Sequence, residues 1–314
     1  MEVKTQNCPC PKKECENNTN CETCRIKHKT AGNLPYCQRP RPLNFDSNGV
    51  NISYFKSGNG RPRLPEAKMF VCKGIFAPPT IDAVPPKAES GAIGGASRGL
   101  PCGSKSIIFV HGNMGSGAFF KDCHKLFGGY TVYTPDSRSH GKSDKVKRLN
   151  YDDMADDIVR LIEHEKMVKP ILFGFSDGGI IGLKIAMKHP DLLSKLFVAG
   201  VNLTPKGING FWRFCMRTTF CLTFPFSLGD KMRLMISGPY IKADDLKAIT
   251  IPTVLFCGEK DIVKLADSQT VVDNAKDAQL VIIPGENHGS YIENNEKLCN
   301  ALKPFLEEEV SDES

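Results

Sequence analysis

The sequence lacks any hydrophobic run that approaches the roughly 20 apolar residues of a transmembrane helix. Its first residues, Met-Glu-Val-Lys-Thr-Gln-Asn-Cys, also lack the apolar core of a secretory signal peptide. Both absences predict a cytoplasmic protein without a membrane span. In that reducing compartment the thirteen cysteines are expected to be mostly thiols or metal ligands, and their odd number excludes complete intramolecular pairing.

A basic character spread over the whole chain is also missing. Residues 1–63 hold eleven of the 41 Lys and Arg but only five of the 35 Asp and Glu, so this segment accounts for the entire net charge of +6. The rest of the chain balances thirty basic against thirty acidic residues. We therefore expect no nucleic-acid partner for the part of the chain beyond this segment.

Two segments have little apolar periodicity. Residues 1–42 contain six cysteines, and Cys21-x-x-Cys24 has a spacing used at zinc sites, but no second pair stands at the expected distance. We expect a disordered tail here. The alternatives are a small zinc knuckle and an adaptor segment that binds metal or nucleic acid. Residues 57–105 contain seven prolines and eight glycines, which predicts a long insertion between two strands.

The remainder, 43–314, reads as one α/β domain. An Asn48-Gly49 turn joins two alternating segments into a hairpin. After it, apolar strands alternate with helical segments, which predicts a mostly parallel, doubly wound sheet covered on both faces. We expect strands over 106–110, 130–134, 171–175, 196–199, 251–257 and 279–283, and helices over 118–127, 151–167, 180–189, 265–276 and 292–308. Ligands of such sheets bind at the carboxyl ends of the strands.

Ser176, Asp261 and His288 each follow a predicted strand. Ser176 is the centre of a Gly-x-Ser-x-Gly sequence between a strand and a helix, a context that exposes a nucleophile on a sharp turn. Serine needs an imidazole to accept its proton, and a carboxylate to hold that imidazole in the right tautomer. The backbone N–H groups of Asn113 and Asp177 are the predicted donors of an oxyanion hole.

Five motifs occur in an order that resembles the α/β-hydrolase fold family, from about residue 43 to 306 without the insertion. They are His111-Gly112, Asp136-x-Arg138-x-x-Gly141-x-Ser143, Gly174-x-Ser176-x-Gly178, Gly258-x-x-Asp261 and Asn287-His288. Gly-Phe-Ser-Asp-Gly-Gly and Gly-Glu-Lys-Asp are most similar to the serine esterase branch that contains valacyclovir hydrolase-like proteins and small bacterial esterases. Ser139 departs from that branch, which has glycine there. The serine also argues against epoxide- or halide-displacing relatives, which use aspartate at this position.

Residues 205–248 interrupt the alternation and are predicted to form a lid. Most of its apolar side chains are expected to pack onto the core, while its Lys and Arg residues form a solvated outer face. A subset is expected to face the substrate, and the candidates are Phe211, Trp212 and Phe214. The Asp177 side chain is either a favourable charge at a helix N-terminus or a partner for a cationic substrate group.

The resulting hypothesis is a serine hydrolase that cleaves a small, hydrophobic carboxylic ester, thioester or related acyl compound through an acyl-enzyme. No metal or cofactor is expected to take part in this reaction. The alternatives are a carbon–carbon bond hydrolase or a cofactor-free perhydrolase with the same triad, and a non-catalytic binding protein. An intact triad argues against the last, because a receptor needs neither a base nor a nucleophile.

Overall fold

The computed structural model describes residues 42–57, 105–224 and 227–306. The predictions for the cysteine-rich tail and for the Pro/Gly-rich insertion fall almost entirely outside these residues. The boundaries of both segments, and the possible zinc site, therefore stay predictions. No helix among the described residues has both the length and the apolar character needed to cross a bilayer.

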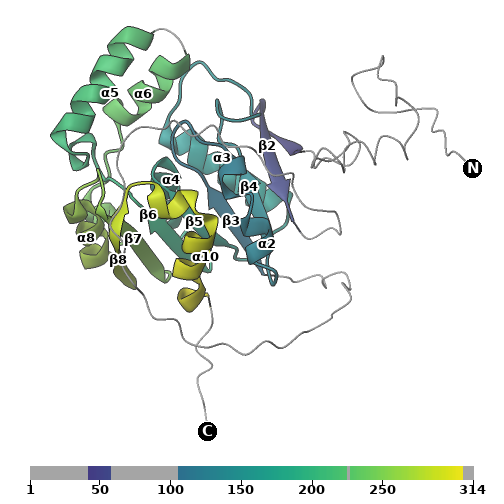
Figure 1. The fold of residues 1–314 in the computed structure, drawn as a ribbon. Helices are drawn as coiled ribbons and strands as arrows, with labels where there is room; N and C mark the ends of the chain where they lie inside the picture. The colour runs from purple at the N-terminus through teal and green to yellow at the C-terminus, as the bar shows by residue number, and fades with distance from the viewer. Residues whose placement is uncertain (1–41, 58–104, 225–226, 307–314) are drawn as a thin grey trace, which may run out of the picture. The chain divides into compact units, whose positions relative to one another are not determined.

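One eight-stranded sheet forms the centre of the fold, and it confirms the predicted class (Figure 1). The strands are β1 (Leu43–Ser47), β2 (Val50–Lys56), β3 (Ser106–Val110), β4 (Thr131–Pro135), β5 (Ile171–Phe175), β6 (Lys195–Ala199), β7 (Thr253–Lys260) and β8 (Ala278–Asn287). Their order is β1-β2-β4-β3-β5-β6-β7-β8. The β1–β2 and β2–β4 pairs are antiparallel and all the others are parallel.

The β1–β2 hairpin turns at the predicted position. Ser47 pairs with Val50, and the two residues between them, Asn48 and Gly49, have φ of 52° and 75°. Positive φ at both central residues is what a type I′ turn requires, and its twist matches that of the flanking strands. The hairpin therefore forms from local sequence alone.

Helices cover both faces of the sheet (Figure 1). The period of two along β3 sends Ile108 and Val110 to one core and Ile107 and Phe109 to the other. The first core is closed by α3 (Tyr151–His164), α4 (Asp177–Lys188) and α8 (Leu265–Asn274). The second is closed by α2 (Cys123–Leu126), α9 (Ser290–Glu293) and α10 (Asn295–Leu302). Both faces are buried, so the central strands read as continuous apolar runs.

Two helices that were predicted as continuous are each broken into shorter elements. The segment 118–127 is split into a 3-10 turn, η2 (Gly117–Phe120), and α2. The Asn295 side chain bonds two backbone groups at the junction, the Phe119 carbonyl at 3.0 Å and the Asp122 N–H at 3.1 Å. The last helix is split between α9 and α10 because Asn294 caps α10 by accepting from the N–H groups of Glu296 and Lys297.

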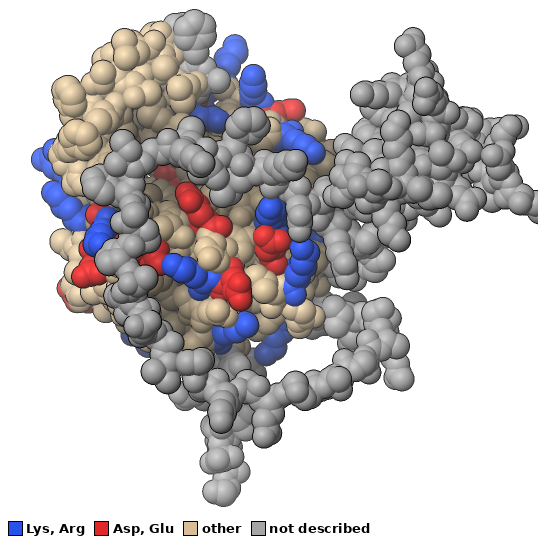
Figure 2. Space-filling view, viewed as in Figure 1, with Lys and Arg blue, Asp and Glu red and all other residues tan. Residues whose placement is uncertain are grey.

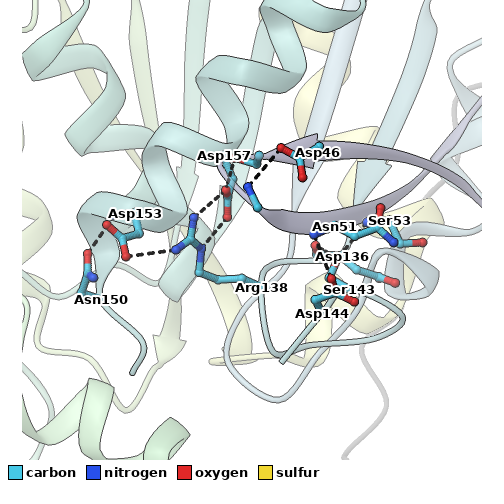
Figure 3. A network of polar contacts seen from close by, with 12 residues as sticks. Asp46, Asn51, Ser53, Asp136, Arg138, Ser143, Asp144, Asn150, Asp153 and Asp157 are labelled. Carbon is cyan, nitrogen blue, oxygen red and sulfur yellow. Dashed lines mark hydrogen bonds and ion pairs between the residues drawn. The ribbon is translucent and has the colours of Figure 1, made fainter. Parts of the chain in front are cut away.

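A buried ion pair joins three elements at one edge of the domain (Figure 3). Arg138 follows β4, and its Nε and Nη2 each donate to an Asp157 carboxylate oxygen of α3 at 2.7 Å. Arg138 Nη1 also reaches Asp153 at 3.0 Å, and the hydroxyl of Ser47 on β1 donates to Asp157. The next residue, Ser139, has a φ of 61°, a conformation that glycine adopts at lower cost.

The interruption between β6 and β7 contains η3 (Pro205–Gly207), α5 (Gly210–Thr223), α6 (Ser227–Ser237) and α7 (Ala243–Leu246). Helices α5 and α6 pack on each other at one end of the sheet (Figure 1). Asp230 and Arg233 of α6 form an ion pair and bond the backbone N–H and carbonyl of Leu149. Helix α6 is therefore tied to the core, and Leu246 of α7 is itself part of the core.

Candidate active site

Ser176 occupies a strained turn between β5 and α4. Its φ is 52° and its ψ is −114°, a conformation that non-glycine residues rarely adopt. The turn is tight because a Cβ on Gly174 would lie 2.1 Å from the Gly178 carbonyl oxygen, and one on Gly178 would lie 2.2 Å from the Val110 carbonyl oxygen. Both glycines are therefore needed for the strand, the turn and the helix to approach this closely.

The Ser176, His288 and Asp261 side chains are hydrogen-bonded in series. His288 Nε2 lies 3.2 Å from Ser176 Oγ, and His288 Nδ1 lies 2.7 Å from Asp261 Oδ1. Since the carboxylate only accepts, Nδ1 donates to it and Nε2 is left to accept from the serine hydroxyl. The Val263 N–H also donates to Asp261 Oδ1 at 2.9 Å and fixes that side chain. The three residues follow β5, β7 and β8, at one edge of the sheet.

The two predicted oxyanion donors flank the serine. Asp177 is the first residue of α4, so its N–H has no acceptor within the helix and lies at the positive end of the helix dipole. Asn113 follows β3, and its side-chain amide donates to the Lys231 carbonyl of α6 at 3.0 Å. Its loop is held by His111, whose Nδ1 contacts the Gly112 carbonyl at 2.7 Å while Nε2 accepts from the Ser137 N–H at 3.0 Å.

A cavity of about 390 Å³ opens over these groups. Its wall is mostly apolar, with a few polar side chains among the lining residues, as in many small-molecule sites. The apolar residues are Met114, Phe175, Ile208, Trp212, Met216, Leu228, Met232, Met235, Ile262 and Val263. A substrate that fills the cavity therefore presents mostly hydrocarbon to the protein.

Helix α5 contributes to the cavity differently from the prediction. Trp212 lines it, together with Cys215, Met216 and Thr219, which lie on the same helical face at intervals of three and four residues. Phe211 and Phe214 lie outside this lining and are each 69% exposed, so their contact with a substrate stays a prediction. The expected packing of the lid onto the core is found for Met232, Leu234 and Leu246, whereas no residue of α5 is buried.

Asp177 combines complete burial with an incomplete hydrogen-bond set. Its Oδ1 accepts from the Tyr151 hydroxyl at 2.9 Å, whereas its Oδ2 has no hydrogen-bond partner among the described residues. Burial raises the pKa of this carboxyl to about 6, an effect that the Tyr151 hydroxyl and the nearby His288 and Asn113 side chains partly offset. The residue also lines the cavity. Buried polar atoms are usually hydrogen-bonded, so the Asp177 Oδ2 atom is expected to accept from a donor that the described residues do not supply.

Tyr151 is a site residue that the sequence reasoning missed. It lies at the start of α3 and shares the buried face with Met154 and Ile158, so its spacing predicts only a core position. The available signal was its hydroxyl, because a buried tyrosine hydroxyl usually has a hydrogen-bond partner. Ile262 and Val263 were missed as well, although they directly follow the predicted acid, Asp261.

Comparison with known proteins agrees with this architecture. The profile of the alpha/beta hydrolase fold family matches residues 105–217. The structure of MGS-M2, an alpha/beta hydrolase enzyme from a deep-sea metagenome library, superposes with a TM-score of 0.64 at 18% identity, covering 87% of this chain and all of that one. This chain has the α/β-hydrolase fold. The predicted resemblance and fold are thereby confirmed, and the valacyclovir hydrolase-like sub-branch stays a prediction.

Two relatives differ in how much of their length they share with this chain. A putative esterase/lipase of Haemophilus influenzae is 24% identical over 238 residues, which is 64% of this chain and 82% of the relative. Ethanol acetyltransferase 1 of Kluyveromyces lactis is 40% identical over 91 residues, which is 28% of this chain and 25% of the relative. The match thus spans only a quarter of the yeast protein's length.

Among the residues that the structure describes, no group of three or more His, Cys, Asp or Glu side chains has an arrangement suited to a metal ion. The cysteine-rich segment predicted as a possible zinc knuckle lies outside those residues.

Proposed function

We propose that this α/β hydrolase is a serine esterase that cleaves small, hydrophobic carboxylic esters or thioesters through an acyl-enzyme. The observation that carries the proposal is the hydrogen-bonded series Asp261–His288–Ser176 at the floor of an apolar cavity. The esterase/lipase relative supports the same reaction class.

In the first half-reaction, Ser176 Oγ attacks the acyl carbon while His288 Nε2 takes its proton. The negative charge that develops on the carbonyl oxygen is stabilised by the N–H groups of Asp177 and Asn113. His288 then gives the proton to the leaving alcohol or thiol, which departs as the carbon–oxygen or carbon–sulfur bond breaks. The acyl group remains on Ser176.

In the second half-reaction, water attacks the acyl-enzyme and His288 takes a proton from it. The carboxylic acid leaves and the proton returns to Ser176. Asp261 holds the imidazole in the tautomer that both steps need and stabilises its charged form.

The proposal is tested by turnover of p-nitrophenyl esters of increasing acyl length. Ser176→Ala and His288→Ala are expected to lower kcat by at least about 10³-fold, with near-native folding. Asn300→Ala, an exposed substitution on α10, serves as the control. Turnover in Ser176→Ala equal to wild type would contradict the proposal.

For the substrate class, we propose that Asp177 pairs with a cationic group beside the acyl carbon, such as the α-ammonium of an amino-acid ester. The support is that Asp177 lines the cavity and that its buried Oδ2 has no hydrogen-bond partner among the described residues. A charge-assisted pair in such a place contributes roughly 1.5–3 kcal/mol, which is about 10- to 150-fold in kcat/KM.

The quantity to measure is the ratio of kcat/KM for an α-amino ester to that for its des-amino analogue. We expect a ratio above about ten in wild type, near one in Asp177→Asn, and unchanged in Asp152→Asn, an exposed carboxylate of α3. The ratio should fall in wild type as pH drops through about 6, the pKa of Asp177, because the protonated carboxyl no longer attracts a cation. If Asp177→Asn keeps the wild-type ratio, Asp177 does not pair with the substrate and is only a charge at the helix N-terminus.

A second candidate activity is transfer of the acyl group to an alcohol in place of water. The apolar cavity wall favours it, because such a wall holds an alkyl alcohol better than water, and the yeast relative is named an ethanol acetyltransferase. Turnover of an acetyl ester in dilute ethanol would then yield ethyl acetate by transfer to ethanol, in addition to acetic acid by hydrolysis. Acetic acid as the sole product at every ethanol concentration would rule out this activity.

A further inference from the structure

Helix α5 has a second apolar face that the cavity does not use. Phe211, Phe214 and Leu222 lie outside the cavity lining, on the side of the helix next to it, and they are 69%, 69% and 78% exposed. Phe224, at the end of the helix, is 62% exposed. Figure 2 shows the surface over α5 and α6 as a broad area with few charged side chains. We call Phe211, Phe214, Leu222 and Phe224 the outer face of α5. Contiguous exposed apolar surface of this kind marks an interaction site.

The three threonine hydroxyls towards the end of α5 donate within the helix itself. The hydroxyls of Thr218, Thr219 and Thr223 donate to the carbonyls four residues earlier, at 3.1, 2.9 and 2.7 Å. The side chain of Asn209 accepts from the Trp212 N–H and caps the helix start. Threonines bonded to their own helix in this way are suited to an apolar surrounding, because they bring no unpaired donor into it.

The charge of the helix indicates which kind of surface it meets. Residues 209–224 contain two cations, Arg213 and Arg217, and no Asp or Glu. A helix with exposed aromatic and leucine side chains flanked by arginines is suited to the boundary of an anionic membrane. A second copy of the chain is a poorer partner, because a two-fold contact of α5 on α5 would pair two helices that each carry two cations and no carboxylate.

The position of the helix connects this surface to the site. Residues of the neighbouring face line the cavity above Ser176, and Trp212 is both part of that lining and 45% exposed. Helix α6 is bonded to the core through Asp230 and Arg233, whereas α5 packs on α6 and η3, and the side chains of its outer face stay exposed among the described residues. A surface that contacts α5 therefore lies next to the cavity.

We propose that the outer face of α5 docks on an anionic phospholipid surface, with the helix lying in the interface and not crossing it. The inference goes beyond the proposed esterase function, since docking requires no turnover. It places the cavity where an acyl compound dissolved in the lipid can reach it.

The test is co-sedimentation of the full chain with vesicles of phosphatidylcholine containing roughly one-third phosphatidylserine. Trp212 is the only tryptophan in the chain, so its emission should shift to shorter wavelength on binding. We expect strong binding that weakens in high salt, and little binding to phosphatidylcholine alone. Leu222→Glu is expected to lower the bound fraction about tenfold, and Arg217→Glu to abolish the preference for the anionic lipid.

Val168→Glu is the matched control, because Val168 is 88% exposed, lies outside the lid and receives the same added charge. It should bind as wild type does. All three variants should hydrolyse a short, water-soluble ester at the wild-type rate, which separates this proposal from the esterase proposal. Wild type that stays in the supernatant, or Leu222→Glu that sediments as wild type does, would overturn the docking proposal. A wild-type dimer that Leu222→Glu dissociates, without vesicle binding, would assign the face to a second copy instead.

Discussion

The Asp177 carboxyl is fully buried, and one of its oxygens has no partner among the described residues. Its pKa is raised from 3.8 to about 6, so the folded state favours the protonated form. Burial of the charged carboxylate therefore lowers the free energy of unfolding above pH 6, and this loss disappears as pH falls toward 4. A difference of about two pKa units between the folded and unfolded states corresponds to a loss of about 3 kcal/mol.

Asp177→Asn is accordingly expected to raise the free energy of unfolding by up to about 3 kcal/mol at pH 8 and to have almost no effect at pH 4. Asparagine keeps an oxygen that can accept from the Tyr151 hydroxyl. Urea denaturation of both proteins at pH 4, 6 and 8 measures the difference. A stability change that is the same at all three values would show that the buried charge is not its cause.

Gly200 lies directly against the imidazole ring of His288. Its φ is 59°, and a Cβ there would lie 2.7 Å from His288 Cε1 and 2.8 Å from His288 Nδ1. Gly200→Ala must therefore displace the ring, and misplacement by about 1 Å can lower kcat by about 10²-fold. We expect that loss with an unchanged KM, measured on a soluble ester.

Gly128→Ala is the control for the glycine prediction, because a Cβ at that position meets no atom within 4 Å. It should keep the wild-type kcat. Equal rates in Gly200→Ala and Gly128→Ala would mean that the imidazole does not depend on this contact.

At the scale of elements, the Arg138–Asp157 pair holds β1, α3 and the loop after β4 together (Figure 3). Arg138→Met leaves the Asp157 charge buried without its partner, which is expected to lower the free energy of unfolding by about 3–5 kcal/mol. Lys184→Met removes the more exposed pair with Asp152 and should cost less than about 1 kcal/mol. Chemical denaturation of both variants makes the comparison, and equal losses would contradict the special role of the buried pair.

Elements could be predicted where the signal is local. The Asn48-Gly49 turn, the buried strands and the strand–turn–helix at Ser176 each follow from a few neighbouring residues. The breaks at η2 and α9 could not, because each depends on an asparagine side chain bonding to backbone. Asn295 acts from 173 residues away in the sequence, at the Asp122 N–H. Helical spacing also could not tell which face of α5 lines the cavity, since both faces are apolar.

At the scale of the whole molecule, chain order was enough to predict where the site lies. Parallel strands carry their carboxyl ends to one edge, so three residues that follow β5, β7 and β8 meet there although up to 112 positions separate them. The cavity was less predictable, because Tyr151, Met232 and Met235 come from elements whose spacing indicates core packing alone. The meeting of polar side chains that directly follow strands can therefore be predicted from sequence. The shape of the cavity above them cannot, because it depends on how the lid packs.

The measurement that tests the central claim most directly is labelling of the full chain with a fluorophosphonate probe, followed by mass spectrometry of the peptides. Ser176 in its strained turn, activated by His288, is expected to carry the single stoichiometric adduct. Labelling should disappear in Ser176→Ala and slow strongly in His288→Ala. Undiminished labelling of Ser176→Ala, or an adduct on another serine of the wild-type protein, would contradict the account.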